Sequence, residues 1–290
     1  MKILVLGASG MIGLAIFNQL SKNKTLLVSG TTTNEKSKKI LENINNEVSV
    51  YLYDFLKEVN HTKFINMVQP QIIINCVGII KQSPSLSNTL HTIQLNSLLP
   101  QQLSLICEDL KIKLIHISTD CVFSGKRGNY KESDDPDPLD LYGRTKLIGE
   151  TINRNDLTLR TSLVGHEILT QNGLLEWFLS QKDYCKGFKN AYFSGFTTVE
   201  FAKIIEKIIL QQTHLSGLYH IASKIISKYD FLNKVKKIYN KDIKIIEDNS
   251  LKINRTLNAT KLNNVMKYNV ETWEYMIEEM LKERFFYVQK

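Results

Sequence analysis

Residues 3–13 read ILVLGASGMIG, and this stretch decides the fold. Residues 3–6 form an uninterrupted apolar run, which is typical of a parallel strand buried on both faces. Gly7, Gly10 and Gly13 follow, and a helical pattern continues to Leu20. Gly7 permits a tight turn, Gly10 lets a pyrophosphate approach the backbone, and Gly13 lets the helix pack against the strand. The stretch therefore predicts a nucleotide site at the helix N-terminus, although its spacing is Gly-x-x-Gly-x-x-Gly and not Gly-x-Gly-x-x-Gly.

Further apolar runs alternate with helical segments in the first half of the chain, at about 25–29, 48–52, 72–74, 113–117 and 157–160. This alternation predicts the α/β class, with a Rossmann-type doubly wound parallel sheet. After Gly165 the pattern changes to helices and short strands without that rhythm, at about 173–181, 199–210, 217–221, 228–239, 243–246 and 272–284. We expect an NAD(P)-binding Rossmann domain over 1–164 and a smaller C-terminal substrate-binding lobe over 165–290. Part of about 190–215 is a candidate for returning to the main sheet.

Composition excludes several classes of protein. The formal net charge of +8 comes from 37 basic and 29 acidic residues, and the basic residues are scattered without a zinc-finger or RNA-binding pattern. No apolar run approaches the roughly 18 residues that a membrane span needs. The four cysteines lack metal-ligand or disulfide-framework spacing and suit a reducing compartment: Cys76, Cys107, Cys121 and Cys185. Because the chain starts directly with a strand, we expect no signal peptide and a cytoplasmic protein that binds neither nucleic acid nor membrane.

The end of the second strand bears on the choice of cofactor. It reads Gly30-Thr31-Thr32-Thr33, where an NAD site normally places an acidic residue for the ribose hydroxyl. Hydroxyls and nearby lysines could instead accept a 2′-phosphate, so we favour NADP(H) and leave NAD(H) open. Asp54 follows the third strand and is either part of the adenine pocket or a helix N-cap.

Residues 113–146 carry the second chemical signal. A buried strand ends in Ser118-Thr119, and helical spacing puts Tyr142 and Lys146 on one face, one turn apart. A free tyrosine has a pKa of about 10, and a neighbouring ammonium lowers it, so a hydroxyl, a phenol and a lysine can deliver a proton. A Tyr-x-x-x-Lys pair by itself is common on surface helices. The glycine motif at the start of the chain makes a catalytic interpretation of this pair stronger.

Four motifs in this order resemble the extended short-chain dehydrogenase/reductases, and most of all the dTDP-4-dehydrorhamnose reductase branch, over nearly the whole chain. They are residues 7–13, residues 118–125, Tyr130-x-Glu132 and residues 142–150. The resemblance implies NAD(P)H-dependent reduction of the 4-keto group of a nucleoside-diphosphate 6-deoxysugar for surface polysaccharide biosynthesis. It implies no metal, and it leaves open whether the chain forms a homodimer.

The resemblance also implies roles for individual residues. Thr119 would hydrogen-bond the sugar C4 oxygen, Tyr142 would donate the proton, and Lys146 would hold the nicotinamide ribose and depress the tyrosine pKa. Asn96 and Arg160 would be structural. Cofactor contacts are implied for Gly7, Ser9, Gly10, Met11, Ile12, Gly13, Thr31, Thr32, Asp54, Phe55, Cys76, Val77, Gly78, Tyr142 and Lys146. Substrate contacts are implied for Thr119, Asp120, Cys121, Val122, Phe123 and Leu163.

Two departures leave the substrate open. Cys121 stands where the branch commonly has an aromatic residue, and Leu163 stands where it commonly has tryptophan. Two alternatives use the same fold: a sugar-nucleotide epimerase or dehydratase with tightly held NAD, and a non-catalytic NADP-binding regulatory subunit. Fold alone does not separate them.

Overall fold

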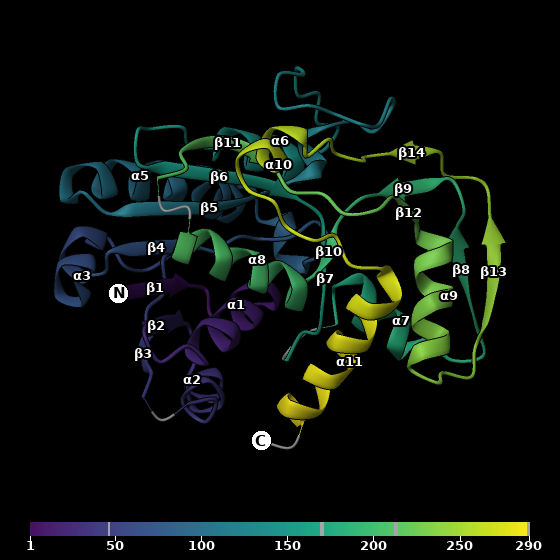
Figure 1. Ribbon diagram of the computed structural model, residues 1–290, viewed down its shortest axis with the longest axis horizontal. Helices are drawn as coiled ribbons and strands as arrows, with labels where there is room; N and C mark the ends of the chain where they lie inside the picture. Colours follow the sequence, from purple (N-terminus) through teal and green to yellow (C-terminus); the bar gives the residue numbers. More distant parts are fainter. Residues whose placement is uncertain (46, 169–170, 212–213, 289–290) are drawn as a thin grey trace. The chain divides into compact units, whose positions relative to one another are not determined.

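The computed structural model describes residues 1–45, 47–168, 171–211 and 214–288 (Figure 1). Its largest sheet has the strand order β11-β6-β5-β4-β1-β2-β3. The strands are β1 (Lys2–Leu6), β2 (Leu27–Thr32), β3 (Ser49–Leu52), β4 (Ile72–Asn75), β5 (Lys113–Thr119), β6 (Asp156–Thr161) and β11 (Gly217–His220). β1 pairs in parallel with both β2 and β4, so the chain reverses direction across the sheet between β1 and β4. This topology confirms the predicted doubly wound sheet and creates a switch point beside β1, where such folds bind ligands.

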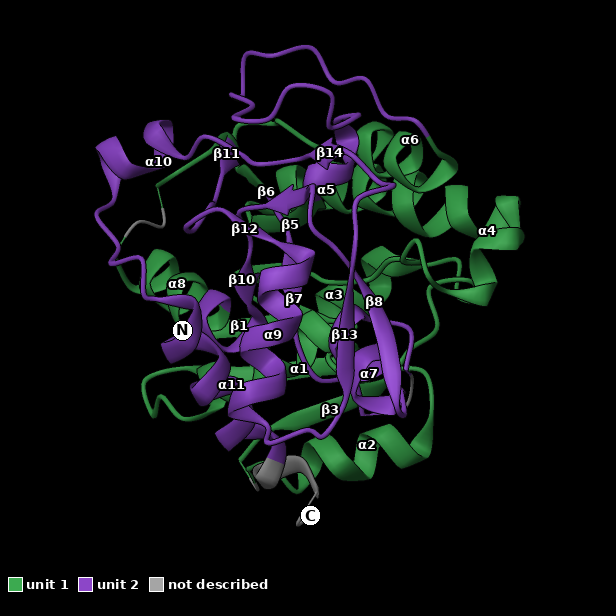
Figure 2. Cartoon of the chain, turned by 90° about the vertical axis from the view of Figure 1, so that its right-hand side faces the viewer, with its two compact units in different colours: residues 1–118, 140–159, 202–218 green, residues 119–139, 160–201, 219–290 purple. Residues whose placement is uncertain are grey.

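The chain divides into two compact units, shown in green and purple in Figure 2. Unit 1 comprises residues 1–118, 140–159 and 202–218, and unit 2 comprises residues 119–139, 160–201 and 219–290.

Unit 1 has helices around a fully buried sheet core. Leu4 and Leu6 are fully buried and pack against residues of α3 (His61–Val68) and α5 (Leu99–Leu110). Ile3 and Val5 point to the opposite face and are also fully buried, which confirms a strand covered on both sides. The other helices of the unit are α1 (Met11–Ser21), α2 (Glu35–Glu42), α4 (Thr89–Ile93), α6 (Leu141–Ile148) and most of α8 (Thr198–Gln211), with a 3₁₀ turn η1 (Pro84–Ser87).

Unit 2 is built from short strands and helices around an aromatic core. Phe193, Phe231 and Trp273 meet edge to face, with ring centroids 5.4–5.9 Å apart. The strands are β7 (Leu163–Val164), β8 (Tyr184–Phe188), β9 (Ala191–Phe193), β10 (Phe196–Thr197), β12 (Ile226–Ser227), β13 (Lys244–Asp248) and β14 (Ile253–Asn254). The helices are α7 (Leu174–Ser180), α9 (Lys228–Ile238), α10 (Thr260–Val265), α11 (Trp273–Val288) and the 3₁₀ turn η3 (Asp120–Val122).

Several element boundaries differ from those expected. β2, β5 and β6 end in threonines and extend past the apolar runs; in β2, Thr31 and Thr32 still pair with β3. Ser227 caps α9, accepting a hydrogen bond from the Asp230 N–H. The helical segment before β5 is interrupted by a π turn, η2 (Gln94–Leu98), between α4 and α5.

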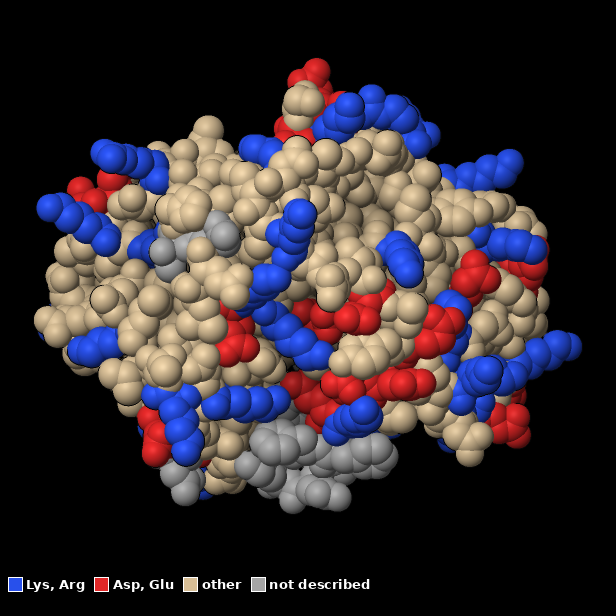
Figure 3. All heavy atoms as spheres, viewed as in Figure 1, with Lys and Arg blue, Asp and Glu red and all other residues tan. Residues whose placement is uncertain are grey.

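Surface charge agrees with a scattered basic excess. On the face seen in Figure 3, Lys and Arg side chains lie among Asp and Glu side chains and do not form one continuous patch. Within the described residues, none of the helices combines the length and the apolar character that a membrane span requires.

Candidate active site

The glycine turn between β1 and α1 forms an anion-binding geometry. Gly7 has φ +71°, and a Cβ added at Gly13 would lie 2.1 Å from the Gly7 carbonyl oxygen, so both positions need glycine. A Cβ at Gly10 would meet only the Gly7 oxygen, at 3.4 Å. Gly10 is the N-cap of α1 and has no side chain with which to cap the first-turn N–H groups, which leaves the helix N-terminus suited to a phosphate.

The threonines at the end of β2 hold this turn in place. The Gly7 N–H donates to Thr31 Oγ1 at 3.0 Å, and the Ala8 N–H donates to the Thr31 carbonyl oxygen at 2.9 Å. Thr32 Oγ1 donates to Ser9 Oγ at 2.9 Å. Thr31 and Thr32 therefore act on the shape of the glycine turn.

Asp54 and Phe55 follow β3. Asp54 Oδ1 accepts a hydrogen bond from the Leu56 N–H at 3.0 Å and so caps a turn, whereas the helix that follows, α3, is capped by Asn60. The interpretation of Asp54 as a helix N-cap is therefore wrong. Phe55 is buried in the core of unit 1.

The segment after β4 is fixed by Asn96 in the π turn. The Asn96 side chain accepts from the Ile79 N–H at 2.8 Å and donates to the Ile79 carbonyl at 2.9 Å. It also donates to Thr145 Oγ1 on α6, at 3.3 Å. One buried amide thus joins the segment containing Cys76, Val77 and Gly78 to the helix that carries Tyr142 and Lys146, which is the structural role expected for Asn96.

Helix α6 approaches the π turn closely. Asp140 caps α6 by accepting from the Gly143 N–H at 2.9 Å, and Lys81 pairs with Asp140 at 2.6 Å. At the other end, a Cβ on Gly149 would lie 1.9 Å from the Asn96 carbonyl oxygen. The helix therefore has a fixed position, with Tyr142 half-buried and Lys146 buried.

Lys146 is surrounded by groups of unit 1. Its Nζ donates to the Ile117 carbonyl oxygen at 2.7 Å and lies 3.4 Å from His116 Nε2. Burial lowers the pKa of Lys146 to about 8, while Glu150 and Cys76 oppose that fall. Burial likewise raises the pKa of the Cys76 thiol to about 12. The ammonium therefore loses its proton at a lower pH than that of a solvent-exposed lysine.

Thr119 and its neighbours lie in unit 2. Thr119 Oγ1 accepts from the Cys121 N–H at 3.1 Å and thereby caps η3. Burial raises the pKa of Asp120, and the Arg255 guanidinium opposes the rise. Val122 and Phe123 are both fully buried. Cys121 is half-buried, and so is Leu163 in β7.

A stacked aromatic cluster orders the loop after Thr119. Phe123 stacks on Tyr130 with centroids 4.1 Å apart and rings 7° from parallel, and the Arg160 guanidinium lies 5.1 Å from the Phe123 ring centroid. The Arg255 guanidinium donates to the Phe123 carbonyl oxygen at 2.9 Å. Arg160 therefore packs in the core of unit 2, in line with the structural role expected for it.

Two residues beside Lys146 were missed from the sequence: His116 in β5 and Asn75 at the end of β4. β4 and β5 pair so that Asn75 lies opposite His116. The only signal in the sequence was a histidine inside an apolar strand. Arg255 beside Asp120 was also missed, because it lies far along the chain from Asp120.

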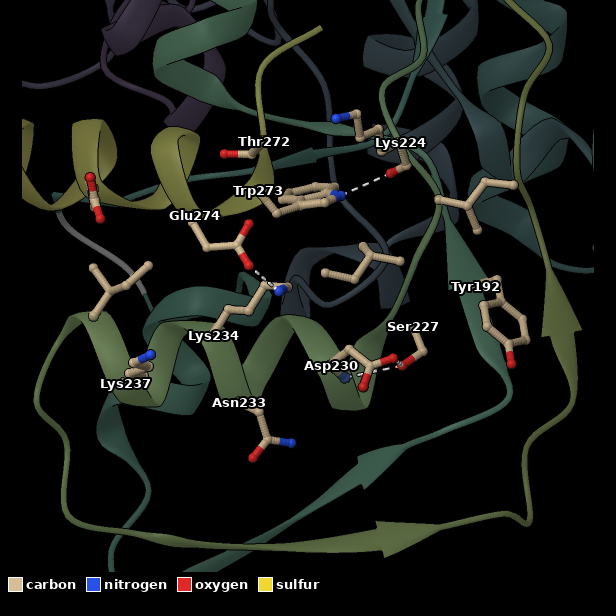
Figure 4. A pocket seen from close by; sticks show the side chains of 14 residues that line it. Tyr192, Lys224, Ser227, Asp230, Asn233, Lys234, Lys237, Thr272, Trp273 and Glu274 are labelled. Atoms are coloured by element: carbon tan, nitrogen blue, oxygen red, sulfur yellow. Dashed lines mark hydrogen bonds and ion pairs between the residues drawn. The ribbon is translucent and has the colours of Figure 1, made fainter.

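A separate hollow of about 800 Å³ lies in unit 2 between α9 and α11 (Figure 4). Several of its polar groups bind one another. Trp273 Nε1 donates to the Lys224 carbonyl at 2.8 Å, Ser227 Oγ donates to Asp230 at 2.6 Å, and Lys234 pairs with Glu274. These pairings engage part of the hollow's polar lining, and the hollow carries no assignment.

Comparison with known proteins extends over the whole chain. A family model described as "RmlD substrate binding domain" matches residues 1–285. The probable low-salt glycan biosynthesis reductase Agl14 of Haloferax volcanii is 26% identical over 255 residues, which cover 84% of this chain and 82% of that protein. Methionine adenosyltransferase 2 subunit beta of Bos taurus is 30% identical over 158 residues, which cover 51% of this chain and 41% of that protein.

Solved structures give the same fold. A dTDP-4-dehydrorhamnose reductase from Bacillus anthracis in complex with NADP has a TM-score of 0.76 at 19% identity, covering 97% of this chain and 99% of that one. A UDP-glucuronic acid 4-epimerase from Bacillus cereus in complex with UDP-glucuronic acid and NAD has a TM-score of 0.78 at 21% identity, covering 100% and 99%.

Proposed function

The chain belongs to the RmlD substrate binding domain family, and on that premise we propose that it reduces the 4-keto group of a nucleoside-diphosphate 6-deoxysugar with NAD(P)H. The reaction would serve the assembly of a surface polysaccharide or glycan. Agl14, a reductase by name, is related over most of its own length, and this supports the reductase over the regulatory subunit, whose match covers half of this chain. We place the activity in the cytoplasm.

The observation that carries the proposal is the buried Lys146 on the same helix face as Tyr142. Placing an ammonium in the interior costs free energy unless the charge is paired and hydrogen-bonded. Here its Nζ donates to a carbonyl at 2.7 Å and sits beside the segment that follows β4. A structural lysine would be more stable with its charge in solvent, so the arrangement favours a chemical role.

The residues present fit a dinucleotide. The open space at Gly10 and the first-turn N–H groups of α1 match a pyrophosphate, and the ends of β1, β2 and β4 lie side by side at the switch point. Gly7, Ser9, Gly10, Met11, Ile12 and Gly13 would line the pyrophosphate, and Cys76, Val77 and Gly78 the middle of the cofactor. When bound, the reduced nicotinamide supplies a hydride to the carbonyl carbon.

Side chains of the protein would supply the proton that the reduction needs. Tyr142 would donate its phenolic proton to the sugar C4 oxygen as negative charge develops there. The Lys146 ammonium would favour the resulting phenolate and hold the ribose hydroxyls. Thr119 would hydrogen-bond the same oxygen, and Asp120 would contact the sugar.

We favour NADP(H) over NAD(H). The hydroxyls of Thr31 and Thr32 are used by the glycine turn, which leaves Thr33 and the exposed Lys36 and Lys39 as candidates for the 2′-phosphate. No acidic residue ends β2. We leave the sugar and its base open, because Cys121 and Leu163 depart from the pattern of the reductase branch.

The test is NADPH consumption, followed by nicotinamide absorbance, on a panel of dTDP- and UDP-linked 4-keto-6-deoxy sugars. NADH is run in parallel, and the matched control is Tyr142→Phe, which removes only the hydroxyl. We expect turnover on at least one sugar and its loss in the variant, with NADPH binding retained. A fully active Tyr142→Phe protein would refute the proton-donor role. NADP(H) binding without turnover on any sugar would favour the regulatory alternative.

A further inference from the structure

His116 is buried between Asn75 and Lys146 in unit 1. It is fully buried in β5, and Asn75 is buried opposite it at the end of β4. Asn75 Nδ2 lies 3.2 Å from His116 Nδ1, and Lys146 Nζ lies 3.4 Å from His116 Nε2. The three side chains form a continuous line from the cofactor-facing end of β4 to the lysine.

The orientation of the Asn75 amide is fixed by its own strand end. The Val77 N–H donates to Asn75 Oδ1 at 3.1 Å, so the amide oxygen is engaged and the NH₂ group faces His116. His116 Nδ1 must then accept a hydrogen bond. A neutral imidazole carries one N–H, which is therefore at Nε2 and faces Lys146. Burial and the nearby Lys146 hold the pKa of His116 well below its usual range, so the ring is neutral.

An N–H at Nε2 favours one protonation state of the lysine. A neutral Lys146 amine has a lone pair that can accept this N–H while the amine still donates to the Ile117 carbonyl oxygen. An ammonium has no lone pair, so its contact with Nε2 sets two donors against each other. Moving the imidazole proton to Nδ1 would transfer the mismatch to Asn75.

Other groups also face Lys146. Cys76 after β4 and Glu150 after α6 both favour the ammonium, and Tyr142 lies one turn away on α6 itself. The Asn75–His116 pair is therefore opposed by these groups, and the charge of Lys146 is set by a balance between them.

We propose that His116 is a positioning residue for Lys146, with Asn75 fixing its tautomer so that the Nε2–H faces the lysine nitrogen and favours the neutral amine. In the proposed reduction, on which this consequence rests, the ammonium supports proton donation by Tyr142. His116 and Asn75 then lower the pH above which the reductase loses activity, because Lys146 loses its charge as pH rises.

The tautomer of His116 can be determined by NMR, without an activity assay. Protein labelled with ¹⁵N-histidine is examined by long-range ¹H–¹⁵N correlation, which distinguishes Nδ1–H, Nε2–H and imidazolium forms. Six histidines are present, and His116→Gln assigns the signal of interest by its loss. We expect a neutral Nε2–H ring from mildly acidic to basic pH. An Nδ1–H tautomer or an imidazolium at neutral pH would overturn the proposal, whether or not the protein is a reductase.

Asn75→Asp tests the consequence. A carboxylate would accept from Nδ1–H, move the ring proton there and make Nε2 an acceptor for the ammonium. The histidine spectrum should therefore switch to the Nδ1–H form. The alkaline limb of the kcat/KM profile should move up by about one pH unit, since an added carboxylate and a new acceptor both favour the charged lysine. The matched control is Asn88→Asp, the same change at the exposed N-cap of α4, where aspartate also caps.

The outcomes are separable. A folded Asn75→Asp protein that keeps the Nε2–H tautomer, or that shows the same alkaline limb as wild type, would contradict the proposal. If Asn75→Asp does not fold, the wild-type tautomer still decides. If no sugar is reduced, the proposed function fails while the histidine spectrum continues to test the Asn75–His116–Lys146 arrangement.

Discussion

Gly149→Ala should disturb the active helix without touching any residue proposed to react. Gly149 is the C-cap of α6 and has ordinary helical dihedral angles, φ −79° and ψ −5°, so alanine is compatible with the backbone there. The added Cβ would lie 1.9 Å from the carbonyl oxygen of Asn96, whereas real contacts to a Cβ begin near 3.0 Å. The end of α6 and the π turn must therefore separate by about 1 Å.

The free-energy cost of Gly149→Ala depends on which atoms the added Cβ meets. The clash is with backbone, which cannot rotate away, so a penalty of about 1–3 kcal/mol is expected, as for other overpacked sites. In a protein of this size that corresponds to a fall in Tm of roughly 2–5 °C. Because Tyr142 and Lys146 lie on the displaced helix, kcat/KM should fall by about ten- to a hundredfold.

Differential scanning fluorimetry and the NADPH assay measure the two effects. The matched control is Gly173→Ala, where the added Cβ meets only the Glu167 carboxylate, at 3.4 Å. Gly173 is the N-cap of α7, so its replacement should cost no more than about 1 kcal/mol. Wild-type Tm and activity in Gly149→Ala would show that α6 and the π turn are not in tight contact.

Two further changes have distinct signatures. Gly10→Ala should lower the Tm only slightly, because its Cβ meets nothing closer than 3.4 Å and only an N-cap glycine is lost, but it should weaken NADPH binding at least tenfold in fluorescence titration. Gly13→Ala, whose Cβ would lie 2.1 Å from backbone, should lower the Tm more. Equal effects of the two substitutions on stability would contradict the geometry of the turn. Burial lowers the pKa of His220 to about 4. Between pH 6.5 and 4 the unfolded chain therefore binds more protons than the folded one. As the pH falls across that interval, up to about 3 kcal/mol of folding stability should be lost. Thermal unfolding against pH should show a shallower acid slope in His220→Gln than in a control at the exposed His91, and equal slopes would refute the assignment.

Local sequence patterns were sufficient to predict much of the secondary structure around the proposed nucleotide site. The apolar run of β1, the glycine turn and the start of α1 are contiguous, so their structure follows from a few residues read together. Tyr142 and Lys146 share a helix face because four residues make about one turn.

What could not be predicted depends on contacts between distant residues. Asn96 bonds Thr145 across 49 positions, and Asn75 meets His116 across 41, so neither pairing leaves a local pattern. The π turn contains Asn96, which bonds both Ile79 and Thr145. The two-residue strands of unit 2, such as β12 and β14, are too short to show an alternating pattern. The roles of the site residues, the domain boundary at 164 and the choice of NADP(H) stay predictions.

The most direct test of the proposed reduction follows the hydride itself. NADPH carrying deuterium at both hydrogen positions of the nicotinamide C4 is incubated with the protein and each dTDP- or UDP-linked 4-keto-6-deoxy sugar, and the product is examined by mass spectrometry and NMR. The proposed function predicts one deuterium at sugar C4, with one NADP⁺ formed per product and no transfer in Tyr142→Phe. An altered sugar without net cofactor oxidation and without deuterium at C4 would contradict it and indicate an epimerase or dehydratase.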